Sequence, residues 1–219
     1  MEIFSYILTA LAAYLLGSIP TGYLVAKAKG IDIRSVGSGN IGATNVFRIL
    51  GKPAGIFVLL ADAAKGFFAV WLVVYFTKWV LVSFPGIFPH GNDPINDRAI
   101  TAGIFAIIGH NYTCFLKFKG GKGIATTAGV LIALAPHAFL VVLVVFILVV
   151  AVSRYISLGS ISAAFCLPFA VWFFHGSKTM IAVMSALGAL AIYKHKANIG
   201  RLLNGTENRF GKKKTEPTK

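Results

Sequence analysis

Long apolar runs separated by short polar segments make up most of this chain. A bilayer core about 30 Å thick needs roughly 20 mostly apolar residues per helical span. Seven runs approach that length and predict seven transmembrane helices, at residues 3–26, 54–77, 99–115, 124–136, 137–153, 158–175 and 178–193. Only the turn signal Ala135–Pro136–His137 separates the fourth run from the fifth, so six spans remain an alternative.

Composition supports a membrane protein. Hydrophobic residues make up 57% of the 219 residues and charged residues only 13%. A soluble domain of this length needs a far more polar surface. The sequence therefore predicts an all-α integral membrane protein, with residues 1–210 as a single seven-helix domain and residues 211–219 as a basic, disordered tail. The first run follows Glu2 without a basic segment, which argues against a cleaved signal peptide.

The distribution of basic residues orients the predicted spans, because cytoplasmic loops carry an excess of Lys and Arg. With seven spans and the N-terminus outside, only Lys78, Arg98 and Lys178 of the 21 Lys and Arg residues face outward. Lys65 lies within a span, and the others face the cytoplasm together with the C-terminus. Merging the fourth and fifth spans would send the basic tail outside.

The net charge of +14 favours anionic partners. Phosphates or lipid headgroups fit better than nucleic acid, because the spans leave no room for a nucleic-acid-binding domain. In the predicted topology the polar and glycine-rich segments all lie on the cytoplasmic side. They are residues 34–48 (RSVGSGNIGATNVFR), 117–126 (KFKGGKGIAT), 154–160 (RYISLGS) and 194–210 (KHKANIGRLLNGTENRF). We expect these four segments to meet at the inner leaflet as one cationic site.

The first of these segments has the composition of an anion-binding nest. Its glycines alternate with hydroxyl and amide residues, in the order Gly37, Ser38, Gly39, Asn40, Gly42, Thr44 and Asn45. Glycine permits backbone conformations in which successive N–H groups converge on an anion. A flexible re-entrant loop is the alternative reading, but Arg48 favours phosphate because a guanidinium pairs with it bidentately.

The second segment resembles a phosphate-binding loop, although the pattern G-x-x-x-x-G-K-[ST] does not fit it. Gly120, Gly121 and Gly123 would let the backbone approach an anion closely, and Lys122 would supply charge. The helix that follows would present its N-terminus to the same anion. The excess of positive charge expected on the cytoplasmic side explains the lysines but not the glycines.

Three further polar features are open to more than one reading. His195 and Asn198 share a face if the last span continues as a helix, although a satisfied interfacial histidine is the alternative. Glu207 lies among basic neighbours and fits a structural ion pair. Asp62 and Lys65 fall inside the second span, where we favour a structural pair over a proton relay because no other span carries an acid.

Acidic residues are scarce on the cytoplasmic side, where only Asp32, Glu207 and Glu216 are expected. Nucleotide-dependent phosphoryl transfer and metal-dependent hydrolysis need carboxylates to hold metal ions. The sequence therefore predicts no metal site and no cofactor. It also lacks the H-x-x-x-x-D pair that many glycerolipid acyltransferases use as a base. If the protein is an enzyme, its substrates must bring part of the chemistry.

At these motifs the sequence resembles a known family, the bacterial acyl-phosphate:glycerol-3-phosphate acyltransferases of the PlsY type. The matching segments are GSGNIGATNVFR, GHNY followed by FKGGKGIAT, RYISL, and KHKANI followed by LLNGTENRF, across nearly the whole chain. Thr113 and Cys114 depart from the family pattern, in which proline is common at this point. The resemblance implies transfer of a fatty acyl group from acyl phosphate to the 1-hydroxyl of glycerol 3-phosphate. The products would be lysophosphatidate and phosphate, in an early step of bacterial phospholipid synthesis.

The resemblance also implies roles for the residues at the motif positions. The expected catalytic residues are Ser38, Arg48, Lys122, His195 and Asn198. The expected substrate-binding residues are Gly37, Gly39, Asn40, Thr44, Asn45, Gly120, Gly121, Gly123, Ser157 and Ser160. Glu207 is expected to be structural.

An acyl phosphate is a mixed anhydride and already activated, so we expect positioning and anion stabilisation to do most of the catalytic work. A substrate phosphate would accept the proton of the attacking hydroxyl, and His195 as general base is the competing assignment. The expected partners are acyl phosphate, glycerol 3-phosphate and membrane lipid, in the bacterial inner membrane with the active site facing the cytoplasm. A small-anion transporter would need polar residues across the membrane, and a structural lipid-binding protein is the second rival.

Overall fold

The computed structural model describes residues 2–84 and 94–211, and every regular element in those ranges is a helix. The chain divides into two compact units, Met1–Pro136 and His137–Lys219. The prediction of an all-α chain is therefore confirmed for the described residues. Apart from Gly211, the tail predicted at residues 211–219 lies outside them.

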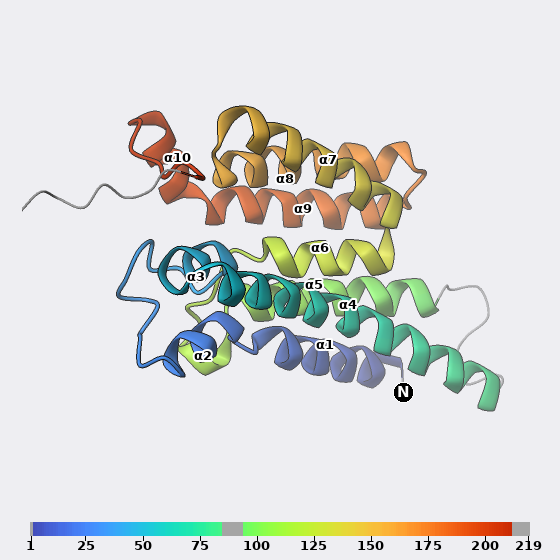
Figure 1. The fold of residues 1–219 in the computed structure, drawn as a ribbon. Coiled ribbons are helices and arrows are strands. Elements are labelled where there is room, and N and C mark those ends of the chain that lie inside the picture. Colours follow the sequence, from blue (N-terminus) through green and yellow to red (C-terminus); the bar gives the residue numbers. More distant parts are fainter. Residues whose placement is uncertain (1, 85–93, 212–219) are drawn as a thin grey trace, which may run out of the picture. The chain divides into compact units, whose positions relative to one another are not determined.

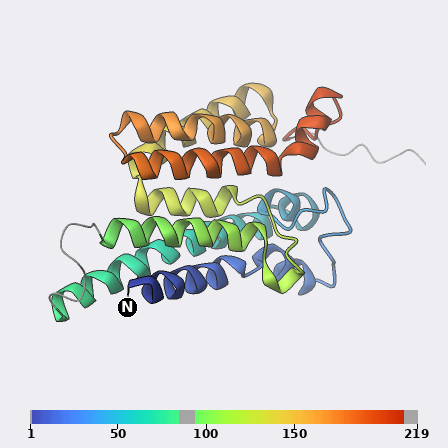
Figure 2. The same cartoon turned by 180° about the vertical axis from the view of Figure 1, so that it is seen from behind.

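Four helices form the body of the first unit, namely α1 (Glu2–Ser18), α4 (Lys52–Ser83), α5 (Pro94–Asn111) and α6 (Ile124–Leu134). The helices α4 and α5 lie between α1 and α6 (Figures 1 and 2). Gly17 of α1 faces a backbone carbonyl of α5, and Gly66 of α4 faces one of α6, so closely that a β-carbon would collide. Small residues of this kind let helix backbones approach and gain van der Waals contact where water cannot drive association.

The first apolar run is not one continuous helix. The helix α1 ends at Ser18, and α2 (Thr21–Lys27) begins after Pro20. Proline has no backbone N–H and disfavours the helical conformation of the residue before it, so the span predicted at 3–26 is interrupted here. The carbonyl of Ser18 instead accepts a hydrogen bond from Thr113 Oγ1 (2.6 Å), and that of Ile19 accepts one from Lys65 Nζ (2.8 Å).

The polar segment after α2 runs as an irregular loop into α3 (Ala43–Leu50), which packs against α4. Apolar residues anchor this segment in a buried cluster made of Ala26, Ile33, Ile41, Val46, Val58 and Leu116. The last of these belongs to a short 3₁₀ helix, η1 (Cys114–Leu116), in the loop between α5 and α6. The cluster therefore holds both glycine-rich loops of the first unit to its helices.

The second unit contains α7 (Pro136–Ser153) from His137 onward, α8 (Ile156–Phe173), α9 (Lys178–Lys194) and the short α10 (Lys196–Leu203). The helices α8 and α9 pack closely at Gly188, where a β-carbon would lie 2.6 Å from the carbonyl oxygen of Ala164. His195 ends α9 and directly precedes α10, which Figure 1 shows at the end of α9.

Five stretches of the described chain are helical, long and apolar enough to cross a membrane, at Glu2–Lys27, Lys52–Ser83, Ile95–Leu116, Pro136–Ser153 and Ile156–Phe173. The other two predicted spans correspond to α6, with 11 residues, and α9, with 17 residues. The break predicted between the fourth and fifth spans is present, because α6 ends at Leu134 and α7 begins at Pro136. The seven-span count itself stays a prediction.

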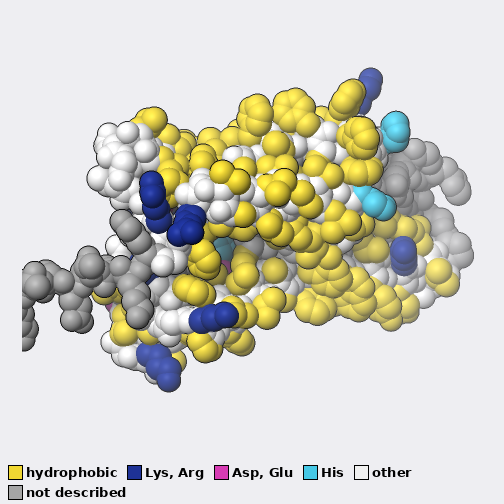
Figure 3. All heavy atoms as spheres, turned by 45° about the horizontal axis from the view of Figure 1, so that its top comes forward, with side chains coloured by type: hydrophobic (Ala, Val, Ile, Leu, Met, Phe, Trp, Pro, Cys, Tyr) yellow, Lys and Arg dark blue, Asp and Glu magenta, His cyan; other side chains and the backbone are white. Residues whose placement is uncertain are grey.

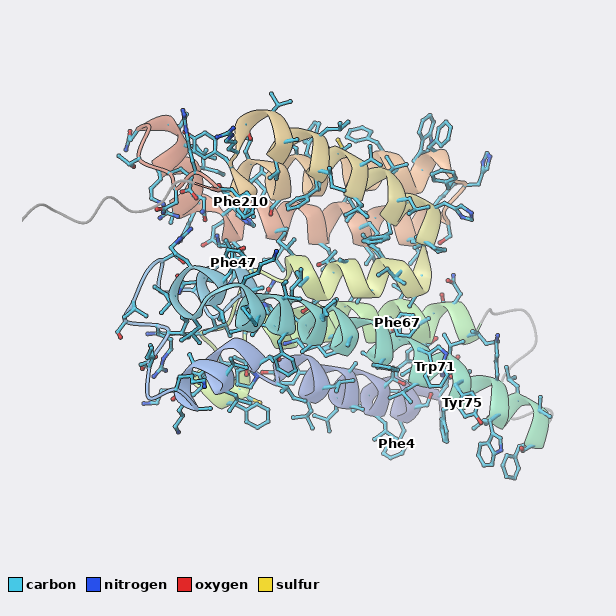
Figure 4. All side chains as sticks on the ribbon, in the orientation of Figure 1. Phe4, Phe47, Phe67, Trp71, Tyr75 and Phe210 are labelled. Atoms are coloured by element: carbon cyan, nitrogen blue, oxygen red, sulfur yellow. The ribbon has the colours of Figure 1, made fainter. Side chains whose placement is uncertain are left out.

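The surface of these helices is suited to lipid. Hydrophobic side chains cover most of the face seen in Figure 3. Phe4 on α1 and the stacked Trp71 and Tyr75 on α4 are exposed and point away from the neighbouring helices (Figure 4). Apolar side chains that face away from the protein are expected where hydrocarbon replaces water.

Candidate functional site

Asn45 shapes the glycine-rich loop of the first unit. Its side chain is buried, and Nδ2 lies within hydrogen-bond distance of the carbonyl oxygens of Ile33 (3.2 Å), Val36 (3.1 Å) and Asn40 (2.9 Å). Its Oδ1 accepts a hydrogen bond from the backbone N–H of Ser38 (2.9 Å). Because one amide satisfies backbone groups along the whole loop, Asn45 sets the loop's conformation.

Ser38 and Arg48 are the groups that this arrangement leaves available. Gly37 (φ +63°) and Gly39 (φ +69°) flank Ser38 in the left-handed region, which favours glycine. Ser38 is exposed, and Arg48 is half-buried in the last turn of α3. Among residues 2–84 and 94–211, neither the Ser38 hydroxyl nor the Arg48 guanidinium has a hydrogen-bond or ion-pair partner. Both groups are therefore open to an anion, as is the exposed Thr44 nearby.

A second arginine in the same loop is already paired. Arg34 Nη2 lies 2.7 Å from Asp32 Oδ2, and Arg34 Nε lies 2.9 Å from Asp32 Oδ1. Hydrogen bonds from the Arg34 side chain and backbone N–H lower the pKa of Asp32 to about 2, so the carboxylate is charged at neutral pH. This pairing leaves Arg48, in the helix that follows the loop, as the arginine of the 34–48 segment that can receive a phosphate.

The loop around Lys122 is held by the end of α5. The backbone N–H of Gly120 donates to the carbonyl of Asn111 (3.2 Å), and that of Gly121 donates to the carbonyl of His110 (3.0 Å). These two N–H groups therefore have acceptors within the chain. Lys122 follows in a half-buried position, and α6 begins directly after Gly123 without a side-chain cap. The charge of Lys122 and the first turn of α6 are what this loop can present to an anion.

The charged pair predicted in the second span is buried in α4. Lys65 Nζ lies 2.9 Å from Asp62 Oδ1, and the two side chains are 5% and 3% exposed. His110, at the end of α5, is buried beside them with Nδ1 3.7 Å from the same carboxylate oxygen. His110 was not among the predicted site residues, and the match of GHNY to a family motif was its only signal in the sequence.

In the second unit, Glu207 joins three predicted or neighbouring polar residues into one network. Its carboxylate accepts hydrogen bonds from Ser157 Oγ (3.1 Å), Asn198 Nδ2 (2.9 Å) and Arg201 Nε (2.7 Å). Burial raises the pKa of Glu207, but these hydrogen bonds and the Arg201 charge outweigh burial, so the pKa lies below its ordinary value. A charged Glu207 thereby ties the start of α8 to α10.

His195 is buried and its Nδ1 lies 2.8 Å from the carbonyl oxygen of Ala191. A carbonyl can only accept, so Nδ1 carries the hydrogen, and in the neutral ring the lone pair is on Nε2. Ser160 donates within its own helix to the carbonyl of Ile156 (3.0 Å).

The second unit also contains a recess of about 700 Å³. Its polar part comes from Ser153, Arg154, Tyr155 and Arg209, and Arg209 Nε donates to the Tyr155 hydroxyl (3.0 Å). Its apolar lining comes from Val152, Leu158, Leu202, Leu203 and Phe210, of which the last is labelled in Figure 4. Neither arginine was among the predicted site residues, because an excess of basic residues on the cytoplasmic side already follows from the topology.

The predicted site residues thus lie in two loops of the first unit and around Glu207 in the second unit. In the first unit Asn45 connects the backbone at Ser38 and Asn40, and the loop at Gly120 and Gly121 rests on α5. In the second unit Ser157, Asn198 and Glu207 are in direct contact. The idea that all four segments form one site stays a prediction.

Comparisons with known proteins agree on one family. A family model described as glycerol-3-phosphate acyltransferase matches residues 7–205. A glycerol-3-phosphate acyltransferase of Clostridioides difficile is 44% identical over 98% of this chain and 100% of its own length. One from Trichlorobacter lovleyi is 48% identical over 90% of this chain and 94% of its own.

Solved structures agree with the sequence matches. The crystal structure of PlsY, an integral membrane glycerol 3-phosphate acyltransferase, in its glycerol 3-phosphate form, superposes with a TM-score of 0.82 at 38% identity. It covers 94% of this chain and 96% of the PlsY chain. Its lysophosphatidic acid form gives a TM-score of 0.79 at 37% identity over the same shares. The chain therefore belongs to the glycerol-3-phosphate acyltransferase family.

Proposed function

We propose that this membrane protein transfers a fatty acyl group from acyl phosphate to the 1-hydroxyl of glycerol 3-phosphate, giving lysophosphatidate and phosphate. The observation that carries this proposal is that Ser38, in the loop that Asn45 holds, and Arg48, in the following helix α3, have no partner in the described chain. A hydroxyl and a guanidinium on a fixed backbone suit a phosphate oxygen. The names of the relatives supply glycerol 3-phosphate as the acceptor.

In the first unit, Ser38, Arg48 and Lys122 would contact the phosphate of a substrate. Asn45 would act indirectly, by keeping the loop in the conformation that presents Ser38. Gly120 and Gly121, whose N–H groups donate to α5, would let Lys122 sit against the end of that helix rather than bind the anion through those N–H groups, and Gly123 would pack against Asn111. Both substrates carry phosphate, which fits the excess of basic over acidic residues in the sequence.

In the second unit, Ser157 and Asn198 would reach substrate from positions that Glu207 holds. The recess at Arg154 and Arg209 would take the acyl phosphate, because it combines guanidinium groups with an apolar lining. An amphiphile with an anionic head needs both kinds of surface.

The reaction balances without a protein nucleophile. The oxygen of the 1-hydroxyl forms a bond to the acyl carbon, the bond between that carbon and the phosphate oxygen breaks, and phosphate leaves with the electron pair. A phosphate oxygen of a substrate takes the hydroxyl proton. Positioning of two bound substrates and stabilisation of the developing negative charge by basic groups would supply the rate enhancement.

His195 is the second candidate for the proton acceptor, and one observation favours it. The contact of Nδ1 with the Ala191 carbonyl leaves the lone pair of the neutral ring on Nε2, which is the state that a general base requires.

The proposal includes a location. Seven spans with the N-terminus outside and the C-terminus inside would place the four polar segments at the cytoplasmic face of a bacterial inner membrane. The excess of Lys and Arg in the corresponding loops supports this orientation.

The test is turnover by the purified protein in lipid nanodiscs. We expect palmitoyl phosphate and glycerol 3-phosphate to give phosphate and lysophosphatidate in equal amounts, and palmitoyl-CoA to give neither. Turnover with the thioester alone would overturn the choice of donor. Absence of an acylated product with either donor would overturn the enzyme and leave a transporter or a lipid-binding protein.

A further inference from the structure

The cluster formed by Lys65, Asp62 and His110 lies inside the first unit and has no part in the reaction described above. All three side chains are at most 5% exposed. Ionised groups in a bilayer are costly, and replacing a buried ion pair by apolar side chains of similar volume often leaves a protein equally stable or more stable. The contacts around the cluster therefore need a reason beyond mutual neutralisation.

Lys65 connects the cluster to the broken end of the first span. Its Nζ lies 2.9 Å from Asp62 Oδ1 and donates to the carbonyl of Ile19 (2.8 Å), which also accepts the N–H of Thr21 (3.1 Å) at the start of α2. The position of the ammonium is thus fixed by α4 and by the segment between α1 and α2, and with it the position of the Asp62 carboxylate.

His110 connects the same carboxylate to the loop around Lys122. One ring nitrogen, Nδ1, lies 3.7 Å from Asp62 Oδ1. The other, Nε2, occupies the space into which a β-carbon on Gly121 would project. The backbone carbonyl of His110 accepts the N–H of Gly121 (3.0 Å), so both the ring and the backbone of His110 hold this glycine.

The next residues of the loop depend on the same support. The N–H of Gly120 donates to the carbonyl of Asn111 (3.2 Å), and a β-carbon on Gly123 would lie 2.7 Å from Asn111 Oδ1. Lys122 lies between two glycines that both pack against the end of α5. Its position therefore follows the position of His110 and Asn111.

We propose that Asp62, together with Lys65, is a positioning residue for Lys122, acting through the His110 ring on which Gly121 rests. The carboxylate orients the ring, the ring fixes the loop, and the loop sets where the Lys122 ammonium meets phosphate. This inference rests on the proposed function for the role of Lys122. The coupling between Asp62 and the loop can nevertheless be measured without turnover.

The principal variant is Asp62→Asn, which keeps the shape of the side chain and removes its charge. Its matched control is Arg98→Gln, which removes another buried charge from the first unit. Arg98 lies near the opposite end of α5, where Nη2 donates to Ser5 Oγ (2.9 Å) and the guanidinium lies over the Tyr6 ring. We expect both variants to lower the thermal midpoint, because each disturbs a buried polar contact.

The first readout is hydrogen–deuterium exchange of peptides covering residues 117–123 in nanodiscs. We expect faster exchange of the Gly120 and Gly121 amides in Asp62→Asn, and wild-type exchange in Arg98→Gln once general destabilisation is subtracted. Equal exchange in the two variants would overturn the inference, whether or not the protein turns over acyl phosphate.

The second readout is the Michaelis constant for glycerol 3-phosphate. A displaced Lys122 should raise KM about tenfold to a hundredfold in Asp62→Asn, with a smaller change in kcat, because the loss of one charge-assisted hydrogen bond to the bound phosphate has an effect of about this size. Arg98→Gln should keep the wild-type KM. A lower thermal midpoint of Asp62→Asn with an unchanged KM would show a purely structural role and would contradict the proposal.

A second variant guards against misfolding of the first. Gly121→Ala inserts a methyl group against His110 Nε2 and leaves Asp62 and Lys65 intact. We expect the same rise in KM. In the double variant the effects should be strongly non-additive, because both changes act on the same ring. Additive effects would mean that Asp62 and Gly121 act independently, against the proposal.

Discussion

At the scale of single residues, Asn45 and Glu207 each connect several polar groups by hydrogen bonds, Asn45 mainly as a donor and Glu207 as an acceptor. Asn45 donates to backbone carbonyls of its loop and accepts one N–H, and Glu207 accepts from three side chains. Both residues lie in motifs that can be identified from the sequence alone. Their partners are decided by the surrounding fold, because an amide or a carboxylate in a polar loop can face either a substrate or the protein's own groups.

Replacing Asn45 by Asp should destabilise the protein. The change keeps the oxygen that accepts from Ser38 and replaces the donor facing the carbonyls of Ile33, Val36 and Asn40 by a second carboxylate oxygen. We expect the free energy of unfolding to fall by about 2–4 kcal/mol, since a buried acceptor would then face acceptors. Thermal unfolding in detergent, followed by circular dichroism, would measure it.

The control is Asn40→Asp, in the same loop. Asn40 Oδ1 accepts from the N–H of Gly42 (2.8 Å), and a carboxylate keeps that bond. The loss should be below about 1 kcal/mol. If both variants proved equally stable, Asn45 would not hold the loop.

Glu207 should make the stability of the folded protein depend on pH in the acidic range. Its pKa is lowered in the folded protein, so its contribution is present above the ordinary value of 4.5 and is lost as the pH falls through the lower folded pKa. The wild-type thermal midpoint should therefore drop more steeply below about pH 4.5 than that of Glu207→Gln. Parallel pH curves for the two proteins would contradict this assignment.

His195→Gln distinguishes the two proton acceptors. If a substrate phosphate takes the proton, the variant should keep kcat within about tenfold of wild type, because general-base catalysis contributes a factor of about 100 or more. A loss of kcat of that size with an unchanged KM would assign the base to His195. His195→Ala, which also removes the contact with the Ala191 carbonyl, would show what the side chain contributes to stability.

At the scale of elements, most candidate site residues lie in short helices and the loops beside them, and the long helices hold these segments in place. The helix α10 has only 8 residues, and the Glu207 network ties it back to α8. The left-handed conformation of Arg154 (φ +62°) ends α7 and turns the chain into α8 beside the recess. A backbone hydrogen bond from Phe210 N to the Arg154 carbonyl (2.7 Å) ties the segment after α10 to that turn.

The recess should be specific for the acyl donor. We expect Arg154→Gln and Arg209→Gln each to raise KM for palmitoyl phosphate about tenfold, the cost of one charge-assisted hydrogen bond, and to leave KM for glycerol 3-phosphate unchanged. Steady-state kinetics with each substrate varied in turn would measure both constants.

The control is Tyr155→Phe, which removes the hydroxyl that receives Arg209 Nε and keeps both charges. Its effect on the donor KM should be smaller than that of either arginine variant. A rise in KM for glycerol 3-phosphate alone would place the acceptor in this recess instead.

At the scale of the whole molecule, the proposed topology can be tested by chemical labelling. With Cys114 and Cys166 replaced, single cysteines at the exposed positions Ser35, Ser177 and Asn204 report the side of the membrane. In intact cells an impermeant maleimide should label position 177 only, and positions 35 and 204 should react after the inner face is opened. Labelling of position 204 from outside would contradict seven spans.

The sequence by itself determined the fold class, the family, and which segments are polar. Apolar length and the Lys and Arg bias are one-dimensional properties, so spans and a preferred orientation follow from them without a structure. The break between α6 and α7 was also predictable, because Pro136 disfavours the helical conformation of the residue directly before it, which is a local effect.

Only the tertiary structure decided which partner each polar group takes. Asn45 forms hydrogen bonds within its own loop, and the N–H groups of Gly120 and Gly121 donate hydrogen bonds to carbonyls of α5. Ser157 donates a hydrogen bond to Glu207, which lies 50 positions further along the chain. His110 joins the buried pair on α4 only because α5 packs beside it. Hydrogen bonds and ion pairs act over a few ångströms in space, and separation along a chain does not encode that distance.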